Sequence, residues 1–316
     1  MSPEHLARER FLADVLAGLQ NQPKAIPCKY FYDARGSALF EEICACSEYY
    51  VTRADLALHE AHLGEISDRV GPQAHVIELG AGSGVKTRKL LAGLEQVRAY
   101  TPIEISASAL AAAARDLEEA FPDIEIRPLK ADYTLDIDSD LLNLEPPSRR
   151  RVVYFPGSTI GNFDHAEALE FLKRMARIAR ADGAILIGVD LMKSEQQLCA
   201  AYDDAQGITA EFNLNLLRRM RDELDARIDL EAFVHEARFN RDESRIEMHL
   251  RATRPTTIEV NGHRFGLESG ETIHTESSHK YSVKDFRELA GRAGLNSVQV
   301  WKDPDGLFSM HWLEPV

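Results

Sequence analysis

Hydrophobic residues follow two different patterns along the chain, and the change falls near residue 190. From residue 74 to residue 191, short apolar runs alternate with segments whose apolar residues recur at helical spacing. These patterns predict strands at 75–79, 98–104, 124–129, 151–155 and 184–190, with helices at 86–94, 106–119 and 164–180. Alternation of this kind builds a parallel sheet with helices on both faces, so an α/β fold is expected.

The flanking segments add helices and a block of antiparallel strands. Apolar spacing predicts helices at 5–20, 38–46, 53–70 and 195–227, and alternating residues predict strands at 232–240, 244–253 and 256–260. The Asn261-Gly262 pair predicts a hairpin turn. A strand (271–281), a helix (283–293) and two strands within 297–312 follow. The last two strands are expected to return to the edge of the parallel sheet, so the β-rich block before them is an insertion.

A glycine-rich turn follows the first predicted strand. Gly80, Gly82 and Gly84 let the backbone approach a bound nucleotide closely, because no Cβ stands in the way. A nicotinamide-type site has the spacing G-x-G-x-x-G, whereas Val85 stands at the sixth position here. The spacing G-x-G-x-G, with Glu78 two positions earlier, resembles motif I of S-adenosylmethionine (SAM) dependent methyltransferases. A turn without a ligand is the alternative interpretation.

Acidic residues at the ends of the next strands support the nucleotide interpretation. Glu104 ends the second strand about twenty residues beyond the glycines, where a carboxylate can accept from two ribose hydroxyls. Lys130-Ala131-Asp132-Tyr133 follows the third strand, at the position where methyltransferases hold the adenine. The spaced acidic pair after a glycine turn therefore favours a cofactor site.

Composition narrows the classes of partner. The chain has 316 residues, of which 44% are hydrophobic and 28% charged, as in a soluble globular protein. Its net charge of −14 repels phosphate backbones, so no nucleic-acid binding is expected. No apolar run is long enough to span a membrane, and the start of the chain lacks a signal sequence. Four cysteines without CxxC spacing indicate reduced thiols, and we expect a cytoplasmic protein without a metal site.

Two further stretches are candidates for a pocket. Four tyrosines occur within the segment from Tyr30 to Tyr50, and they either pack as amphipathic side chains or line a site. Residues 156–162 follow a buried strand beside the glycine turn, at the edge where open parallel sheets bind ligands. Asn162 there is either a ligand-binding amide or the cap of the next helix.

Taken together, these stretches resemble the histidine Nα-methyltransferases of ergothioneine biosynthesis. The residues that carry the resemblance are 29–33, 48–50 with 52–53, 78–84, 157–162, 201–204, 245–248 and 275–278. They extend over nearly the whole chain, and their combination is far more specific than the glycine motif alone. The resemblance implies a class I, Rossmann-like SAM domain at 56–191 plus 282–316. It also implies a substrate domain at 1–55 plus 192–281.

The resemblance also implies a role for individual residues. Gly80, Gly82, Gly84 and Lys86 would hold the methionine end of SAM, Glu104 the ribose, and Asp132 and Tyr133 the adenine. Family members more often have Asp at the position of Glu104. Asn162 and Tyr202 would bind the substrate carboxylate, Tyr32 and Tyr49 would surround the amino group and ring, and Glu276, Ser278 and Met248 would hold the imidazole.

These assignments are chemically consistent, although each has a simpler alternative. An amide and a phenol hold a carboxylate without adding charge near a cationic cofactor. A buried Glu accepts from an imidazole N–H and rejects rings that lack one. Glu276 could instead be a strand-face charge, Met248 core filling, Tyr202 a cover for the core, and Ser278 a residue without a special role.

The expected reaction is an in-line methyl transfer from SAM to the neutral α-amine of L-histidine. The amine must lose a proton before each transfer, and a water relay near Tyr32, the catalytic candidate, is expected to accept it. Three transfers would give histidine betaine (hercynine), the first step of ergothioneine biosynthesis, in an enzyme expected to be monomeric. The alternatives are a methyltransferase of the same fold acting on another amino acid or amine, and a SAM-binding regulatory module.

Overall fold

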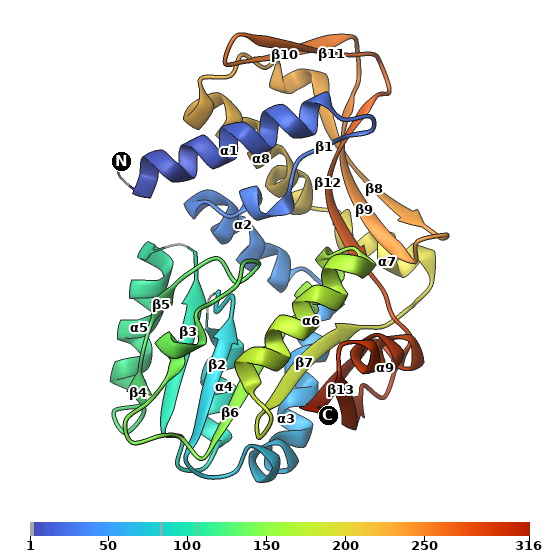
Figure 1. Ribbon diagram of the computed structural model, residues 1–316. Coiled ribbons are helices and arrows are strands. Elements are labelled where there is room, and N and C mark those ends of the chain that lie inside the picture. Colours follow the sequence, from blue (N-terminus) through green and yellow to red (C-terminus); the bar gives the residue numbers. More distant parts are fainter. Residues whose placement is uncertain (1–2, 83, 106) are drawn as a thin grey trace. The chain divides into compact units, whose positions relative to one another are not determined.

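The computed structural model describes residues 3–82, 84–105 and 107–316, with Ser83 of the glycine turn outside the described residues. The chain divides into two compact units (Figure 1). Met1–Tyr50 with Lys193–His279 forms the first, here called the N-terminal unit. Val51–Met192 with Lys280–Val316 forms the second, here called the parallel-sheet unit. Each unit is therefore built from segments distant in sequence.

The parallel-sheet unit is organised around one sheet, whose described strands lie in the order β13-β14-β7-β6-β2-β3-β4, with β5 also paired to β3. The strands are β2 (Ala74–Leu79), β3 (Ala99–Glu104), β4 (Glu125–Ile126), β5 (Leu129–Lys130), β6 (Arg150–Phe155), β7 (Ala184–Asp190), β13 (Leu295–Lys302) and β14 (Phe308–Pro315). Strands β2, β3, β4, β5, β6 and β7 pair in parallel, and β14 joins β7 antiparallel. The expected return of the last two strands to the sheet edge is confirmed.

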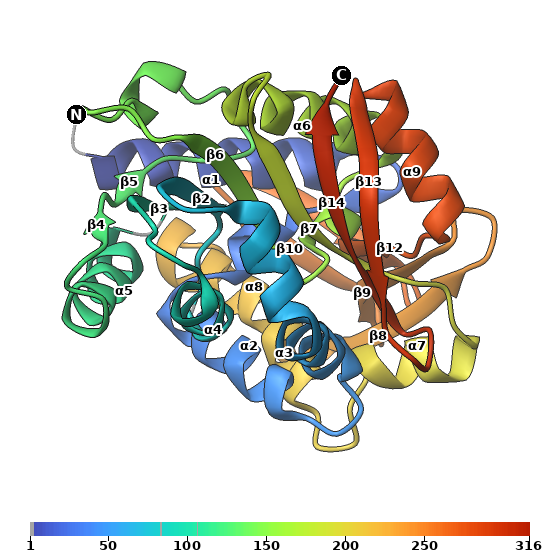
Figure 2. The same ribbon diagram turned by 90° about the horizontal axis from the view of Figure 1, so that it is seen from below.

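Helices cover both faces of this sheet (Figure 2). Helices α3 (Tyr50–Val70), α4 (Val85–Gly93) and α5 (Ala107–Ala120) lie on one face, and α6 (His165–Ala179) and α9 (Val283–Arg292) on the other. The β2 and β6 strands are buried along almost their whole length, and their central residues are apolar because both faces of the sheet are covered. Phe171 of α6 and Phe286 of α9 are completely buried in the core of the second face. The predicted α/β fold is confirmed.

The N-terminal unit combines helices with a sheet whose strands pair antiparallel except for β1, which pairs with β12 in parallel. Its helices are α1 (Pro3–Gln20), α2 (Ala34–Ala45), α7 (Glu195–Tyr202) and α8 (Ile208–Leu224). Its main sheet has the order β1-β12-β9-β8, formed by β1 (Lys24–Ala25), β12 (Thr272–His279), β9 (Arg245–Ala252) and β8 (Phe233–Asn240). The β10 (Thr256–Val260) and β11 (His263–Leu267) strands form a separate hairpin. Asn261 and Gly262 turn it with φ of 48° and 77°, which confirms the predicted hairpin.

Two predicted elements are wrong in detail. The helix expected over 195–227 is two helices, because Gly207 has a left-handed φ of 75° and the Asp204 carboxylate caps the second helix. That carboxylate accepts from the backbone N–H groups of Ile208 (3.0 Å) and Thr209 (2.7 Å). The strand expected over 124–129 is broken into β4 and β5, since Pro128 has no N–H to donate to a ladder. No helix in the described part of the chain is long and apolar enough to cross a membrane.

Candidate active site

The glycine turn leads from the buried strand β2 directly into helix α4. Gly80, Gly82 and Gly84 have φ of 76°, 50° and 71°. These values lie in the left-handed region, which residues with a Cβ rarely adopt. A Cβ added at Gly82 or Gly84 would meet no described atom within 4 Å, so the turn presents open space at these positions. The positive φ values explain why glycine recurs here, and the open backbone suits a ligand that lies against it.

The residues predicted to hold the nucleoside gather next to this turn. The Gly80 N–H donates to the Ile103 carbonyl (2.9 Å), and the Ala131 N–H donates to the Glu104 carbonyl (3.2 Å). These two bonds bring the ends of β2, β3 and β5 together, so Glu104 and Asp132 follow neighbouring strands at the carboxyl edge of the sheet. A Cβ on Gly80 would lie 3.1 Å from the Tyr133 ring, which therefore packs against the turn.

The carboxylates at this edge are held by local hydrogen bonds. Asp132 Oδ1 accepts from the Thr134 N–H (2.9 Å) and hydroxyl (2.5 Å). Glu104, which is partly exposed, accepts at Oε1 from the Ile105 N–H (2.8 Å). Both side chains thus have restricted orientations before any ligand binds, and Glu104 is accessible to one.

Glu78 lies beneath the turn and is completely enclosed. Its Oε2 accepts from the Thr87 hydroxyl (2.6 Å) of α4 and from the Tyr100 hydroxyl of β3. Burial raises the pKa of Glu78 to about 7, although its two hydrogen bonds favour the charged form. Glu78 therefore fastens the start of α4 to the sheet.

Lys86 is paired with a carboxylate that our sequence-based interpretation missed. Lys86 Nζ lies 2.8 Å from Asp55 Oδ2 on α3, and the Gly157 N–H donates to the same oxygen (2.9 Å). Asp55 is completely buried; burial opposes its charge, but Lys86 and His59 outweigh burial and hold its pKa well below the usual range. The i, i+4 spacing of Asp55 and His59 on a predicted helix was the only signal in the sequence.

His59 extends this buried network to the sheet. Its Nδ1 donates to the Asp55 carbonyl (2.8 Å), and its Nε2 lies 2.8 Å from the Tyr154 hydroxyl of β6. Burial lowers the pKa of His59, but the hydrogen bond and charge of Asp55 outweigh burial and leave it raised. Charged groups are therefore concentrated between α3, α4 and the loop after β6.

The loop after β6 is held in a defined conformation. Gly157 and Ser158 have φ of 77° and 63°, and the Ser158 Oγ accepts from the Asp190 N–H (2.8 Å) of β7. A 3₁₀ turn over Thr159–Asn162 follows. Asp164, not Asn162, caps α6, since its carboxylate accepts from the Ala166 and Glu167 N–H groups. The interpretation of Asn162 as the helix cap is therefore wrong.

The tyrosines of the N-terminal unit divide between packing and a polar cluster. Tyr30 stacks on Phe11 and donates to Asp14 (2.6 Å), which is a packing role. Tyr49, by contrast, is buried with its ring 6.1 Å from that of Tyr202. The pKa of Tyr49 is raised well above its usual value by burial and by Tyr202, Cys44, Tyr32 and Glu276. The predicted substrate residues Tyr32, Tyr49, Tyr202 and Glu276 are therefore neighbours.

Strand β12 adds the remaining predicted substrate residues. Ser278 accepts at Oγ from the Tyr202 hydroxyl (2.7 Å), which joins β12 to the end of α7. Glu276 lies opposite Met248 of β9, and Met248 is 2% exposed. The register shifts between His274 and Glu276, which is a β-bulge at Thr275. Glu276, Ser278 and Met248 therefore share the face of the sheet on which Tyr202 lies.

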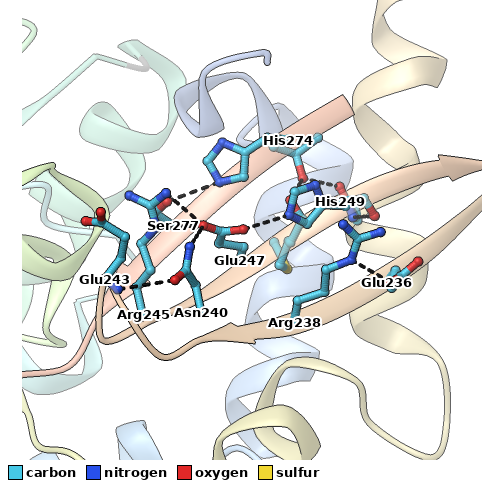
Figure 3. Close-up of polar contacts among 12 residues, drawn as sticks. Glu236, Arg238, Asn240, Glu243, Arg245, Glu247, His249, His274 and Ser277 are labelled. Atoms are coloured by element: carbon cyan, nitrogen blue, oxygen red, sulfur yellow. Dashed lines mark hydrogen bonds and ion pairs between the residues drawn. The ribbon is translucent and has the colours of Figure 1, made fainter. Parts of the chain in front are cut away.

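The opposite face of the same sheet carries a separate set of ion pairs (Figure 3). Glu247 accepts from Asn240 (2.9 Å) and Arg245 (2.8 Å) and lies 3.1 Å from His249 Nε2. Ser277 pairs with Glu247 and His274 pairs with His249 in the strand register. The ion-paired residues lie on the outer face of this sheet. Glu276 does not belong to this set, because the bulge places its side chain on the face that carries Met248.

The described residues contain no cluster of histidine, cysteine and carboxylate side chains suited to a metal ion, and all four cysteines are free thiols. The fold thus brings Tyr32, Tyr49, Tyr202, Met248, Glu276 and Ser278 together in the N-terminal unit. It brings the glycines, Lys86, Glu104, Asp132 and Tyr133 together in the parallel-sheet unit, which also carries Asn162. Each group provides a compact set of polar side chains.

Comparison with known proteins gives consistent results. A family model described as "Histidine-specific methyltransferase, SAM-dependent" matches residues 11–315. A Mycolicibacterium smegmatis protein named histidine N-alpha-methyltransferase is 38% identical over 309 residues, covering 96% of this chain and 94% of that protein. A Mycobacterium tuberculosis protein of the same name is 36% identical, with 97% and 94% covered. Ergothioneine biosynthesis protein 1 of Neurospora crassa is 29% identical over 88% of this chain and 32% of its own length.

Proposed function

The chain belongs to the family of SAM-dependent, histidine-specific methyltransferases, and we propose that it methylates the α-amino group of L-histidine to the trimethylated betaine, the first step of ergothioneine biosynthesis. The observation that carries the choice of substrate is the bulge in β12, which places Glu276 beside Met248 and Ser278. A carboxylate, a hydroxyl and an apolar thioether on one buried face suit a ring with polar N–H groups and apolar edges.

The residues of the parallel-sheet unit fit SAM, which supplies the activated methyl group on its sulfonium. Positive φ and open space at Gly82 and Gly84 let the methionine portion lie close to the backbone of the turn. Glu104 is the acceptor assigned to the ribose, and Asp132 and Tyr133 are assigned to the adenine. Lys86, held by Asp55, is assigned to the carboxylate of the methionine portion.

The N-terminal unit is assigned to the amino acid. Glu276 accepts from the imidazole N–H, and the Ser278 hydroxyl donates its proton to the other ring nitrogen. Tyr202 is assigned to the carboxylate, toward which its hydroxyl turns from Ser278 when the amino acid binds. The same role for Asn162 stays a prediction. Tyr49 stays protonated, since burial raises its pKa, and serves as a hydrogen-bond donor rather than a base.

Proton removal from the substrate amine is assigned to water near Tyr32, whose side chain is 40% exposed. Its ring packs edge-on against Phe40 and Phe212, which keeps the phenol in place. The aromatic rings of this cluster also suit the growing positive charge of the methylated amine, because ring faces attract quaternary ammonium groups. This feature supports continuation to the trimethylated product.

Mass spectrometry of L-histidine incubated with SAM and the protein tests this function. We expect the successive addition of three methyl groups, each with consumption of one SAM. The same assay with a panel of other amino acids tests the alternative of a different amine substrate. SAM consumption with another amino acid but not with histidine would contradict the proposal. The cytoplasmic location, the monomeric state and the absence of nucleic-acid binding stay predictions.

A further inference from the structure

A buried amide on α8 connects the elements that carry the two substrate residues Tyr202 and Glu276. Asn213 is 0% exposed, and its Nδ2 donates to the His249 carbonyl of β9 (3.0 Å) and to His235 Nδ1 of β8 (2.8 Å). Its Oδ1 lies 2.8 Å from the hydroxyl of Thr275, which is 1% exposed. One side chain thus bonds to three neighbouring strands, β8, β9 and β12.

The partners determine the orientation of every group in this network. The His249 carbonyl is only an acceptor, so the Asn213 nitrogen must face it and the amide oxygen must face Thr275. His235 Nδ1 then accepts from Asn213, which leaves the proton on Nε2. This proton is donated to the Tyr202 carbonyl (2.8 Å). Burial lowers the pKa of His235, in agreement with a neutral ring that donates at one nitrogen and accepts at the other.

Thr275 is the extra residue of the bulge. Its hydroxyl is the group through which the hydrogen-bond network of Asn213 binds the bulge. Ile273 pairs with Leu250 and His274 with His249, whereas Glu276 pairs with Met248. With regular alternation, Glu276 would point to the face that carries His274 and His249. Thr275 and Glu276 instead follow one another on the inner face, and the Thr275 hydroxyl can donate to Asn213 Oδ1 or to the Met248 carbonyl (3.0 Å).

We propose that Thr275 and Asn213 are positioning residues for substrate specificity: they hold the bulge that turns Glu276 toward the amino-acid side chain. A strand that loses its bulge shifts by one residue, and a shift of one residue moves a side chain to the opposite face. The same amide, through His235, fixes the carbonyl of Tyr202. The strand that carries Glu276 and the backbone of Tyr202 are therefore both held by the Asn213 side chain.

This inference rests on the proposed function, since it concerns how Glu276 reads the imidazole. Its test compares Thr275→Val, which removes only the hydroxyl from a side chain of the same shape, with Thr275→Ser, which keeps the hydroxyl. Thr272→Val on the same strand is the control, because Thr272 lies before the bulge. Glu276→Ala tests the proposed function separately. For each variant we measure histidine and SAM affinity, the ratio of kcat/KM for histidine to that for phenylalanine, and the thermal unfolding midpoint.

Thr275→Val is expected to weaken histidine binding about tenfold, which is the loss typical of a misplaced buried hydrogen bond. The ratio of kcat/KM for histidine to that for phenylalanine is expected to fall to a similar degree. SAM affinity is expected to stay unchanged, and Thr275→Ser and Thr272→Val to resemble the parent protein. If Thr275→Val does not fold, Thr275→Cys provides the same comparison with a weaker donor.

Two results overturn the inference alone. One is a Thr275→Val protein that keeps its histidine affinity and preference although Glu276→Ala loses them. The other is a variant whose histidine and SAM affinities fall together, which indicates general damage to the fold. A Glu276→Ala protein with unchanged histidine affinity removes the substrate assignment itself, and this inference with it.

Discussion

Lys86 and Asp55 form an ion pair of 2.8 Å next to the glycine turn, and the carboxylate of the pair is completely buried. The same Asp55 oxygen also accepts from the Gly157 N–H at the start of the loop that ends at Asn162. One carboxylate therefore connects the helix that follows the glycine turn to the loop that follows β6. A buried charge that loses its partner strongly destabilises a fold, so the stability of the parallel-sheet unit is expected to depend on this contact.

Asp55→Asn tests the importance of this pair. The substitution leaves Lys86 without its buried counterion, and we expect a loss of about 3 kcal/mol in the free energy of unfolding. SAM binding is expected to weaken because Lys86 is no longer held in place. Urea unfolding and calorimetric titration with SAM measure the two effects. Glu60→Gln is the matched control, since Glu60 pairs with Lys89 between the same two helices at the surface and contributes less than about 1 kcal/mol.

The raised pKa of Glu78 predicts that the stability of the protein depends on pH. Its folded-state pKa of about 7 lies above the ordinary value of 4.5, so the folded protein binds more protons than the unfolded chain between these values. This group therefore stabilises the folded protein fully below about pH 4.5. As the pH rises from there to about 7, the free energy of unfolding falls by roughly 3 kcal/mol.

Glu78→Gln tests this pH dependence, because a neutral amide oxygen can still accept from Thr87 and Tyr100. Urea unfolding between pH 5 and pH 8 is expected to show a smaller decline for the variant than for the parent protein. His59, whose pKa is raised, contributes stability below about pH 6.5 that is lost as the pH rises through its folded-state pKa. This contribution is present in both proteins, so it cancels in the comparison. Parallel curves for the two proteins would refute the assignment to Glu78.

Glu276→Ala is expected to raise KM for histidine steeply while SAM affinity stays nearly unchanged. The reason is that the imidazole N–H loses its acceptor in a buried site, at a cost of roughly tenfold to hundredfold in affinity. Calorimetric titration with histidine and with SAM separates the two effects. Unchanged histidine affinity in this variant would show that Glu276 does not bind the imidazole.

Ser278 and its neighbour Ser277 provide a comparison within one strand. Ser278 lies on the face with Tyr202, whereas Ser277 lies opposite Glu247 on the other face and 3.1 Å from His274. Ser278→Ala is expected to weaken histidine binding about tenfold, because the imidazole and the Tyr202 hydroxyl both lose a partner. Ser277→Ala is expected to have no effect. Steady-state kinetics of the two variants decide between a site on the inner face and one on the outer face.

The turns that sequence analysis predicted correctly depend on local chemistry. Glycines 80, 82 and 84 occupy left-handed conformations that favour glycine, and Asn261-Gly262 forms a turn that depends on those two residues. The alternation of strands and helices around them predicted the parallel sheet. Asp55 was missed because its partners, Lys86 and Gly157, are distant in sequence, and the i, i+4 spacing of Asp55 and His59 within a helix does not identify them.

The sequence by itself determined the α/β fold, the glycine turn and the family, because backbone conformations and hydrophobic periodicity are set by neighbouring residues. Only the tertiary structure decided on which side of the sheet Glu276 lies. The alternation of residues 271–279 is compatible with either face, and the choice depends on the bulge at Thr275. That bulge is bonded to Asn213, which lies 62 positions earlier in the chain. A contact between such distant segments forms only when α8 packs against the sheet.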